Sequence, residues 1–357
     1  MHRFCLLLIL IALIPGAPMV AKAELDTTDA DHLAEIRRLI DGARANDDGA
    51  RLAQAKTMLA EIPPSPDGRL LSAVIRQMDH DFAGALEDLD AVLDARPNDP
   101  QARLSRAFVN TTLGRHDQAR ADCRALPIRT GQLVIAACRA WVASLTGRAE
   151  PSYQLLNGLV ADGGDADPNV RSWVHTILAD IASRLGEVDE AEAHWNSALA
   201  LGPGQIRTLV GYADFLIRAG RPEDAHRLLD DPDLVASDHI LFLRAHAAKQ
   251  AGLDYQEPWS ILEERLNEDL LIGETGHTRE QGLAMLRIGD DPELALDLAQ
   301  LNWREQKEPV DARLLLEAAL AAGDDDALRT VRSWYEATGL EDQAVQTLLA
   351  DSARTAF

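Results

Sequence analysis

The chain has 357 residues, of which 35 are Lys or Arg and 58 are Asp or Glu, for a formal net charge of −23 at pH 7. A negative field of this size repels phosphate backbones and anionic lipid, so it argues against nucleic-acid and membrane-surface binding and favours a neutral or basic partner. The length suggests two compact domains, unless a repeat architecture extends over it as one unit.

Residues 1–23 have the layout of a secretory signal peptide. Arg3 supplies a basic start, residues 4–14 are apolar and uncharged, and Ala21 and Ala23 are the small residues that a signal peptidase requires before its cut. The apolar run would rise about 16 Å as a helix, too little for a hydrocarbon core of about 30 Å. We therefore expect cleavage near Ala23 and a periplasmic or secreted protein without membrane insertion.

The rest of the chain has the periodicity of amphipathic helices. Apolar residues recur at three and four positions, and strand-like alternation is nowhere sustained. Helical stretches end at Gly and restart after Asp, Asn or Pro, as at 113–115 and 97–100. This pattern predicts an all-α protein made of helix hairpins joined by short turns.

Small residues in these hairpins recur at a spacing of 34. The pairs are Ala73 and Ala107, Ala85 and Ala119, Ala179 and Ala213, Gly186 and Gly220, and Ala191 and Ala225. A period of 34 built from two helices is typical of tetratricopeptide repeats (TPRs), and residues 179–203 resemble that family closely. The resemblance is strongest over 66–230 and implies a right-handed α-solenoid of tandem helix pairs, in which Ala lets paired helices approach closely.

The phase of this period divides the chain. Repeats are expected to begin near Pro66, Pro100, Leu133, Ser172 and Ile206, with a looser one from about Asp238. We interpret 24–65 as a degenerate N-terminal helical pair or cap, 66–252 as core repeats, 253–278 as an irregular insertion or hinge, and 279–357 as degenerate C-terminal pairs.

The sequence contains none of the common catalytic motifs. It has no Gly-x-Ser-x-Gly, phosphate-binding loop, His-Glu-x-x-His or Cys-x-x-Cys. His239 and His246 are seven residues apart without an obvious third ligand, which favours ordinary histidines over a metal site. We expect no enzymatic activity, no cofactor and no bound metal.

Two cysteines remain after signal removal, Cys123 and Cys138. They fall on adjacent helices of neighbouring repeats, and the signal peptide implies an oxidising compartment, so a disulfide is one interpretation. The other is a pair of buried small apolar residues.

The resemblance implies that a concave groove is formed by the second, fifth, ninth and twelfth positions of each first helix. The ninth positions are Val74, Phe108, Trp141, Asp180, Asp214 and His246, with Trp173 at a second position. This order predicts a groove with an apolar, aromatic half and an acidic half, suited to a peptide with apolar and basic residues. Alternatively, the aromatic rings pack between repeats and the acids are ordinary solvated side chains.

The resemblance implies a non-enzymatic scaffold or adaptor for protein–protein interaction in the bacterial periplasm. The alternative is an accessory domain of an enzymatic or metal-handling envelope system. One variant of the fold clamps a carboxyl-terminal acid with Lys, Arg and Asn from successive first helices. That basic constellation is absent from this sequence, which disfavours acidic tails as ligands.

Overall fold

The computed structural model describes residues 27–46, 49–161, 166–202, 206–230, 234, 238–272 and 277–355. The expected signal peptide, residues 1–23, and its cleavage site lie outside the described residues. Across the described ranges the chain is helical and contains no strand. None of the helices described there has the length and apolar character needed to cross a membrane.

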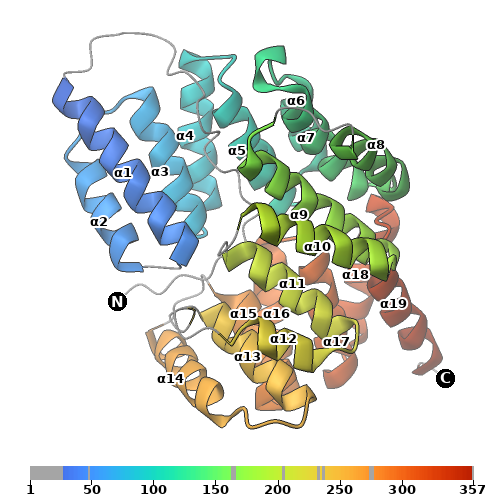
Figure 1. The fold of residues 1–357 in the computed structure, drawn as a ribbon. Helices are drawn as coiled ribbons and strands as arrows, with labels where there is room; N and C mark the ends of the chain where they lie inside the picture. The colour runs from blue at the N-terminus through green and yellow to red at the C-terminus, as the bar shows by residue number, and fades with distance from the viewer. Residues whose placement is uncertain are drawn as a thin grey trace.

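The helices follow one another as a series of packed pairs (Figure 1). In chain order the pairs are α1 (Thr27–Asn46) with α2 (Gly49–Ala60), α3 (Pro66–Met78) with α4 (Phe82–Ala95), α5 (Pro100–Thr112) with α6 (His116–Arg124), α7 (Gln132–Ser144) with α8 (Ala149–Ala161), α9 (Pro168–Leu185) with α10 (Val188–Leu201), α11 (Ile206–Arg218) with α12 (Pro222–Leu228), α13 (Asp238–Gln250) with α14 (Gln256–Ile272), α15 (Thr278–Ala284) with α16 (Pro292–Glu305), and α17 (Pro309–Ala322) with α18 (Asp325–Thr338). A single helix, α19 (Gln343–Thr355), follows. The 3-10 helix η1 (Ile128–Thr130) precedes α7, and α15 continues into a π-helical turn, η3 (Met285–Gly289).

The first helices begin where the sequence period places them. Helices α3, α5, α11 and α13 start at Pro66, Pro100, Ile206 and Asp238, as expected, and α7 starts one residue before Leu133. Helix α9 is one turn longer than expected because Asp167 caps its N-terminus through Asn169 N at 2.8 Å and Pro168 occupies the first turn.

The alanines of the 34-residue period lie where the helices of a pair meet. Ala73, Ala107, Ala179 and Ala213 are all completely buried, as are the partner alanines of the second helices, Ala85, Ala119, Ala191 and Ala225. A larger side chain at these places would hold the paired helices apart, so the recurring Ala is a consequence of close packing. The prediction of an all-α tetratricopeptide-like solenoid is confirmed.

Two C-terminal features differ from the sequence interpretation. Most of the segment 253–278, expected to be an insertion or hinge, is α14, the ordinary second helix of the pair begun by α13. It is long, and Trp259, Leu262 and Leu266 bury its inner face. The repeat period does not predict helix α19, because a single helix after the last pair has no place in a two-helix period.

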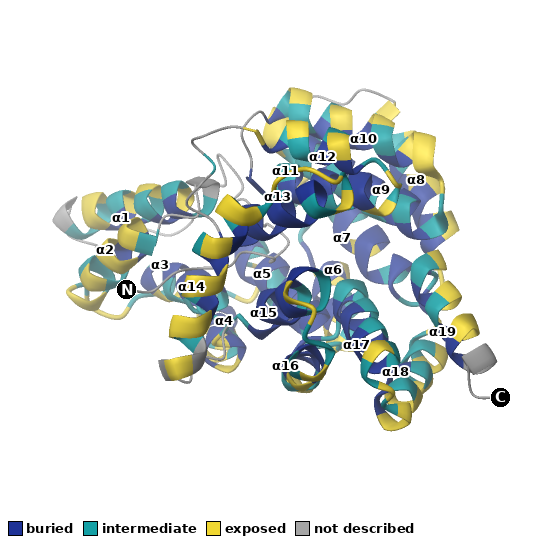
Figure 2. Ribbon diagram, turned by 90° about the horizontal axis from the view of Figure 1, so that it is seen from below, coloured by how far each residue is buried: buried dark blue, intermediate teal, exposed yellow. Residues whose placement is uncertain are grey.

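The solenoid closes on itself, because the C-terminal helices return to the pairs α5–α6, α7–α8 and α9–α10 (Figure 1). Lys307 N donates to Thr112 O at 2.8 Å. Further along, Arg184 Nη1 donates to Glu341 O at 3.3 Å, and the Glu341 carboxylate accepts from Ala149 N. Buried residues therefore gather on the inner helices, and exposed residues on outer ones such as α8, α10 and α18 (Figure 2).

Candidate ligand-binding cavity

A cavity of about 910 Å³ lies inside the closed solenoid. Its first wall is formed by α7, α9, α11 and α13, and the facing wall by α17 and α19. Helix α1 contributes Asp41 and Arg44 at one end. The groove that the sequence predicts as an open concave face is thus a partly enclosed cavity in the folded chain.

The concave positions of three consecutive repeats meet in this cavity. The lining includes Trp173, Thr176, Asp180 and Ser183 of α9, Arg207, Val210, Asp214 and Ile217 of α11, and His239, Phe242 and His246 of α13. Because the positions recur with the repeat, the packing of successive first helices brings each set to the same surface.

Two of the expected groove residues do not reach the cavity. Val74 shares a buried cluster with Ile36 and Ile40 of the N-terminal pair. Phe108 is buried and stacks on Trp141, with ring centroids 4.2 Å apart. The expectation that Val74 and Phe108 form an exposed apolar half of the groove is wrong, because neighbouring helix pairs cover α3 and α5 at these positions.

An aromatic row leads from the core to the cavity wall. Trp141 is only 2% exposed, yet it lines the cavity as well as stacking on Phe108. The ring of Trp173 is tilted against Phe108 at 6.4 Å and is partly buried. The cavity therefore has an aromatic wall whose inner members are fixed by core packing.

The two expected acids line the cavity, but each has a cationic partner one helical turn later. Arg184 Nε lies 3.0 Å from Asp180 Oδ2, and Arg218 Nε lies 2.9 Å from Asp214 Oδ2. Burial raises the pKa of Asp214, but the charges of Arg218 and Arg313 outweigh it and hold this pKa below its ordinary value. Both carboxylates are about half exposed, Asp180 at 48% and Asp214 at 43%, so each keeps free acceptor positions toward the cavity.

His246 is a neutral, largely apolar part of the wall. Its ring stacks on Phe242 with centroids 5.5 Å apart, and Gln250 Nε2 donates to its Nε2 at 2.8 Å. Burial lowers the pKa of His246 to about 4, and the positive charges of Arg287 and Lys249 act in the same direction. Among the described residues no group of three or more His, Cys, Asp or Glu is placed to hold a metal ion.

The sequence does not predict the wall of the cavity that α17 and α19 form. Pro309, Val310 and Leu314 of α17 and Leu348 of α19 add apolar surface. Arg313, in the same wall, is paired with Asp342 at 2.9 Å. These residues lie more than 90 positions after α11 in the chain, and no periodic signal relates them to the concave positions that they face.

A buried ionic network holds α15 against α17 beside the cavity. Arg279 is 1% exposed and lies 2.6 Å from Asp311 and 2.7 Å from Glu308. It also donates to Gln306 Oε1 at 2.8 Å. Burial raises the pKa of Glu308 to about 7, with the charge of Asp311 adding to this effect and that of Arg279 opposing it.

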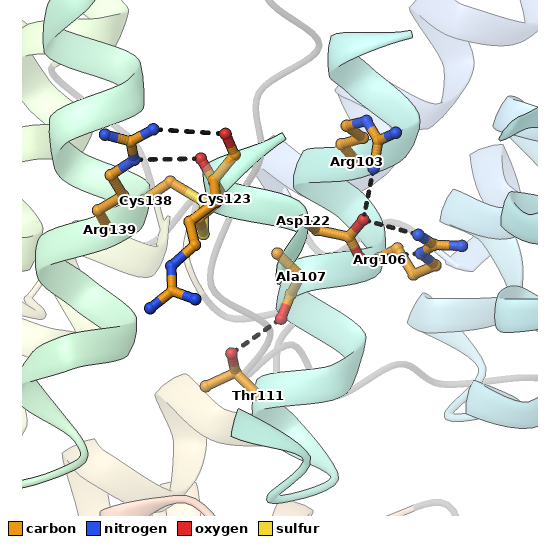
Figure 3. The surroundings of a disulfide bond; sticks show 9 residues. Arg103, Arg106, Ala107, Thr111, Asp122, Cys123, Cys138 and Arg139 are labelled. Atoms are coloured by element: carbon orange, nitrogen blue, oxygen red, sulfur yellow. Dashed lines mark hydrogen bonds and ion pairs between the residues drawn. A yellow bond between two sulfur atoms is a disulfide. The ribbon is translucent and has the colours of Figure 1, made fainter. Parts of the chain in front are cut away.

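Cys123 and Cys138 are joined by a disulfide between α6 and α7, with Cα atoms 5.6 Å apart (Figure 3). Both side chains are fully buried, so the bridge also fills core volume. Arg139 donates to the carbonyls of Cys123 and Arg124, both at 3.4 Å, which ties α7 to the end of α6 next to the bridge (Figure 3). The disulfide lies away from the cavity lining and supports the repeat interface.

Comparison with known proteins identifies repeats in two parts of the chain. Tetratricopeptide-repeat family models match residues 79–132 and 182–248. Cellulose synthase operon protein C of Xanthomonas axonopodis pv. citri (strain 306) is 26% identical over 285 residues, which is 77% of this chain and 18% of that protein. The chain therefore spans less than a fifth of the length of the curated relative that it matches.

Two solved structures are also similar. A tetratricopeptide repeat protein from Parabacteroides merdae has 13% sequence identity and a TM-score of 0.39, with 82% of this chain and 99% of that chain covered. The type IV pilus biogenesis factor PilW has 16% identity and a TM-score of 0.37, with 81% of this chain and all of that chain covered.

Proposed function

Because this chain belongs to the tetratricopeptide-repeat family of interaction scaffolds, we propose that it is a non-enzymatic adaptor of the bacterial periplasm that binds a protein segment in its central cavity. The observation that carries the proposal is the convergence of the concave positions of α9, α11 and α13 on one partly enclosed cavity of about 910 Å³. This volume lies within the range of binding pockets, roughly 300–1,000 Å³.

The chemistry of the wall suggests what the segment carries. Apolar side chains would pack against Trp173 and Phe242, since aromatic rings at the centre of an interface provide most of the affinity in many complexes. A Lys or Arg would bind between Asp180 and Asp214, whose carboxylates are half exposed one repeat apart. Each carboxylate accepts several hydrogen bonds, so a second cation can bind beside the internal arginine.

The periplasmic location rests on the signal-like residues 1–23. The name of the curated relative links that protein to a cellulose synthase operon, which is consistent with a role beside a multi-protein envelope system. Release of the full-length protein by osmotic shock, with a cytoplasmic marker retained, is the result expected for a periplasmic protein.

A photoreactive amino acid at Thr176 in the full-length chain tests the cavity in the cell. Thr176 lines the cavity without being a core residue, and the matched control is Asn196, which is exposed on the outer helix α10. We expect a protein to be crosslinked from position 176 and not from 196, through a segment with apolar and basic residues. Asp180→Lys with Asp214→Lys should abolish capture without loss of helicity by circular dichroism.

The same crosslinked species from both positions, or none from position 176, would contradict binding in the cavity.

A further inference from the structure

Arg207 occupies a part of the cavity that the proposed function leaves unexplained. It is the second residue of α11 and lines the cavity together with Arg44 of α1 and Glu308 of α17. These three helices are far apart in the sequence, and the closure of the solenoid brings them to one end of the space. Asp214 is two turns further along α11, about 10 Å away at 1.5 Å per residue.

Among the described residues, Arg207 has no acceptor for its guanidinium group. Its Nε and Nη2 are buried and make no hydrogen bond, and it forms no ion pair. Other arginines of the cavity wall differ, since Arg218 has Asp214 at 2.9 Å, Arg313 has Asp342 at 2.9 Å, and Arg287 has Glu317. An unpaired guanidinium in such a place is destabilising unless an anion binds to it.

The neighbouring charged groups do not satisfy Arg207. Glu308 is bound to Arg279 at 2.7 Å and belongs to the network that joins α15 and α17. Burial lowers the pKa of Arg207 well below its ordinary value, and the charge of Arg44 lowers it further, whereas Glu308 raises it. The guanidinium of Arg44 has the charge of Asp41 on its own helix to balance it, whereas Arg207 forms no ion pair with a described carboxylate. A ligand that brings a carboxylate to this end of the cavity would supply that partner.

Other donors in the same lining point to a ligand that carries acceptors. Trp173 Nε1, Trp195 Nε1 and Ser183 Oγ are buried and make no hydrogen bond to the described residues. An indole N–H can only donate, so Trp173 and Trp195 share the requirement of Arg207 for an acceptor, and the Ser183 hydroxyl can donate to one as well.

We propose that Arg207 is a carboxylate anchor, at which the segment bound in the cavity places a carboxylate from its C-terminus or from an Asp or Glu side chain. This inference rests on the proposed function, and it specifies which end of the segment lies beside α1. The planar guanidinium accommodates a carboxylate through two parallel hydrogen bonds. The residues next to the carboxylate then lie against Trp173, and a basic residue about 10 Å away reaches Asp214.

This anchor differs from the Lys, Arg and Asn clamp described in the sequence analysis, whose absence disfavours acidic tails as ligands. That clamp takes these residues from successive first helices. The anchor described here joins α11 with α1, which belong to pairs separated by four others in the solenoid. The expectation that acidic groups are disfavoured is therefore replaced by a single defined site for one.

Three pools of N-acetylated random hexapeptides test the anchor on the immobilised full-length protein. The first has a free C-terminal carboxylate and no Asp or Glu, the second a C-terminal amide and no Asp or Glu, and the third an amide with one Asp or Glu. We expect at least one carboxylate pool to be retained about ten-fold or more over the uncharged amide pool, as measured by mass spectrometry. The pool that is enriched identifies the source of the carboxylate.

Substitutions at Arg207 give the matched comparison. Arg207→Gln should remove the difference between pools, Arg207→Lys should retain part of it, and Arg304→Gln, at an exposed position of α16, should leave it unchanged. Because Arg207 lacks an internal acceptor, Arg207→Gln should leave the Tm equal or higher.

Equal retention of amide and carboxylate pools by the wild-type protein would overturn the anchor while leaving the proposed function intact. Retention of no pool would overturn both. A Tm lowered by several degrees in Arg207→Gln would assign Arg207 a structural role and would also reject the anchor.

Discussion

Trp141 and Trp173 belong to one aromatic row but have different surroundings. Trp141 is buried and stacked on Phe108, whereas Trp173 is partly exposed at the cavity. We therefore expect Trp141→Ala to lower the free energy of unfolding by about 3–5 kcal/mol. Trp173→Ala should cost less stability, since less of its ring is removed from water, but it should remove a binding surface. Urea unfolding and crosslinking from position 176 measure the two effects.

Equal loss of stability in both variants would show that Trp173 is a core residue as well, and the aromatic wall would then lose its proposed role in binding.

His246 should make the stability of the fold depend on pH. Its folded pKa is about 4, whereas an unfolded histidine titrates near 6.5. Between these values the unfolded chain binds a proton that the folded chain does not, so the free energy of unfolding falls as the pH drops from about 6.5 to 4. The full difference is on the order of 3 kcal/mol. Above pH 7 the contribution is complete.

Urea unfolding of wild type and His246→Gln at a series of pH values measures this contribution. The stability of the variant should decrease less steeply between pH 6.5 and 4. The matched control is His32→Gln at an exposed position, which should follow the wild type. If the free energy of unfolding fell equally steeply with pH in the wild type and in His246→Gln, the proposal that His246 is buried in its neutral form would be contradicted.

At the scale of elements, the disulfide between α6 and α7 stabilises the junction of two repeats. It closes a loop of 15 residues, for which the chain-entropy relation gives about 3 kcal/mol. We expect Cys123→Ala with Cys138→Ala to lower the free energy of unfolding by about this amount in oxidising buffer. Reductant should lower the free energy of unfolding of the wild type toward that of the variant, and it should leave the free energy of unfolding of the variant unchanged. An effect of reductant on the variant would assign the loss to something other than the bridge.

The helices were predictable because each boundary has a local cause. Apolar residues at three- and four-residue intervals define the buried face, and side-chain caps such as Asp99, which accepts from Ala102 N at 3.0 Å, mark the starts. The sequence of 253–278 favours an interruption of the repeats, because Pro258 and Gly273 are typical helix breakers. Pro258 in fact lies in the first turn of α14, where proline is tolerated.

At the scale of the whole molecule, the closure of the solenoid depends on a close backbone approach between Gly147 and Gly339. A Cβ at Gly147 would lie 3.2 Å from Gly339 O, whereas a Cβ at Gly220 meets nothing within 4 Å. Gly147 and Gly220 both have φ in the left-handed region, at +76° and +73° respectively. Gly147→Val and Gly220→Val therefore share the backbone strain, and only the first also disturbs the closure.

We expect Gly147→Val to increase hydrogen exchange in α19 and to raise the radius of gyration measured by small-angle X-ray scattering. Gly220→Val should lose stability without either change. The same exchange pattern in both variants would show that the closure does not depend on this approach.

The walls of the candidate site were predictable to different degrees. The concave positions of α9, α11 and α13 follow from the repeat period, and Arg207 occupies one of them, so the second-position rule could have found it. The facing residues, among them Arg313 and Gln343, carry no such signal. The pairing of Asp180 with Arg184 is visible in the sequence as an i, i+4 spacing, and it makes this part of the groove less acidic than the ninth positions alone predict.

The sequence by itself determined the helical pairs, their order and the side of each first helix that faces inward, because periodicity, caps and recurring alanines act over a few tens of residues. Only the tertiary structure decided that the solenoid closes, that Phe108 is covered, and that Arg44 and Arg207 share one end of a cavity. Small rotations at each repeat interface accumulate along a solenoid, so contacts between its distant turns depend on all the interfaces together and on no local pattern.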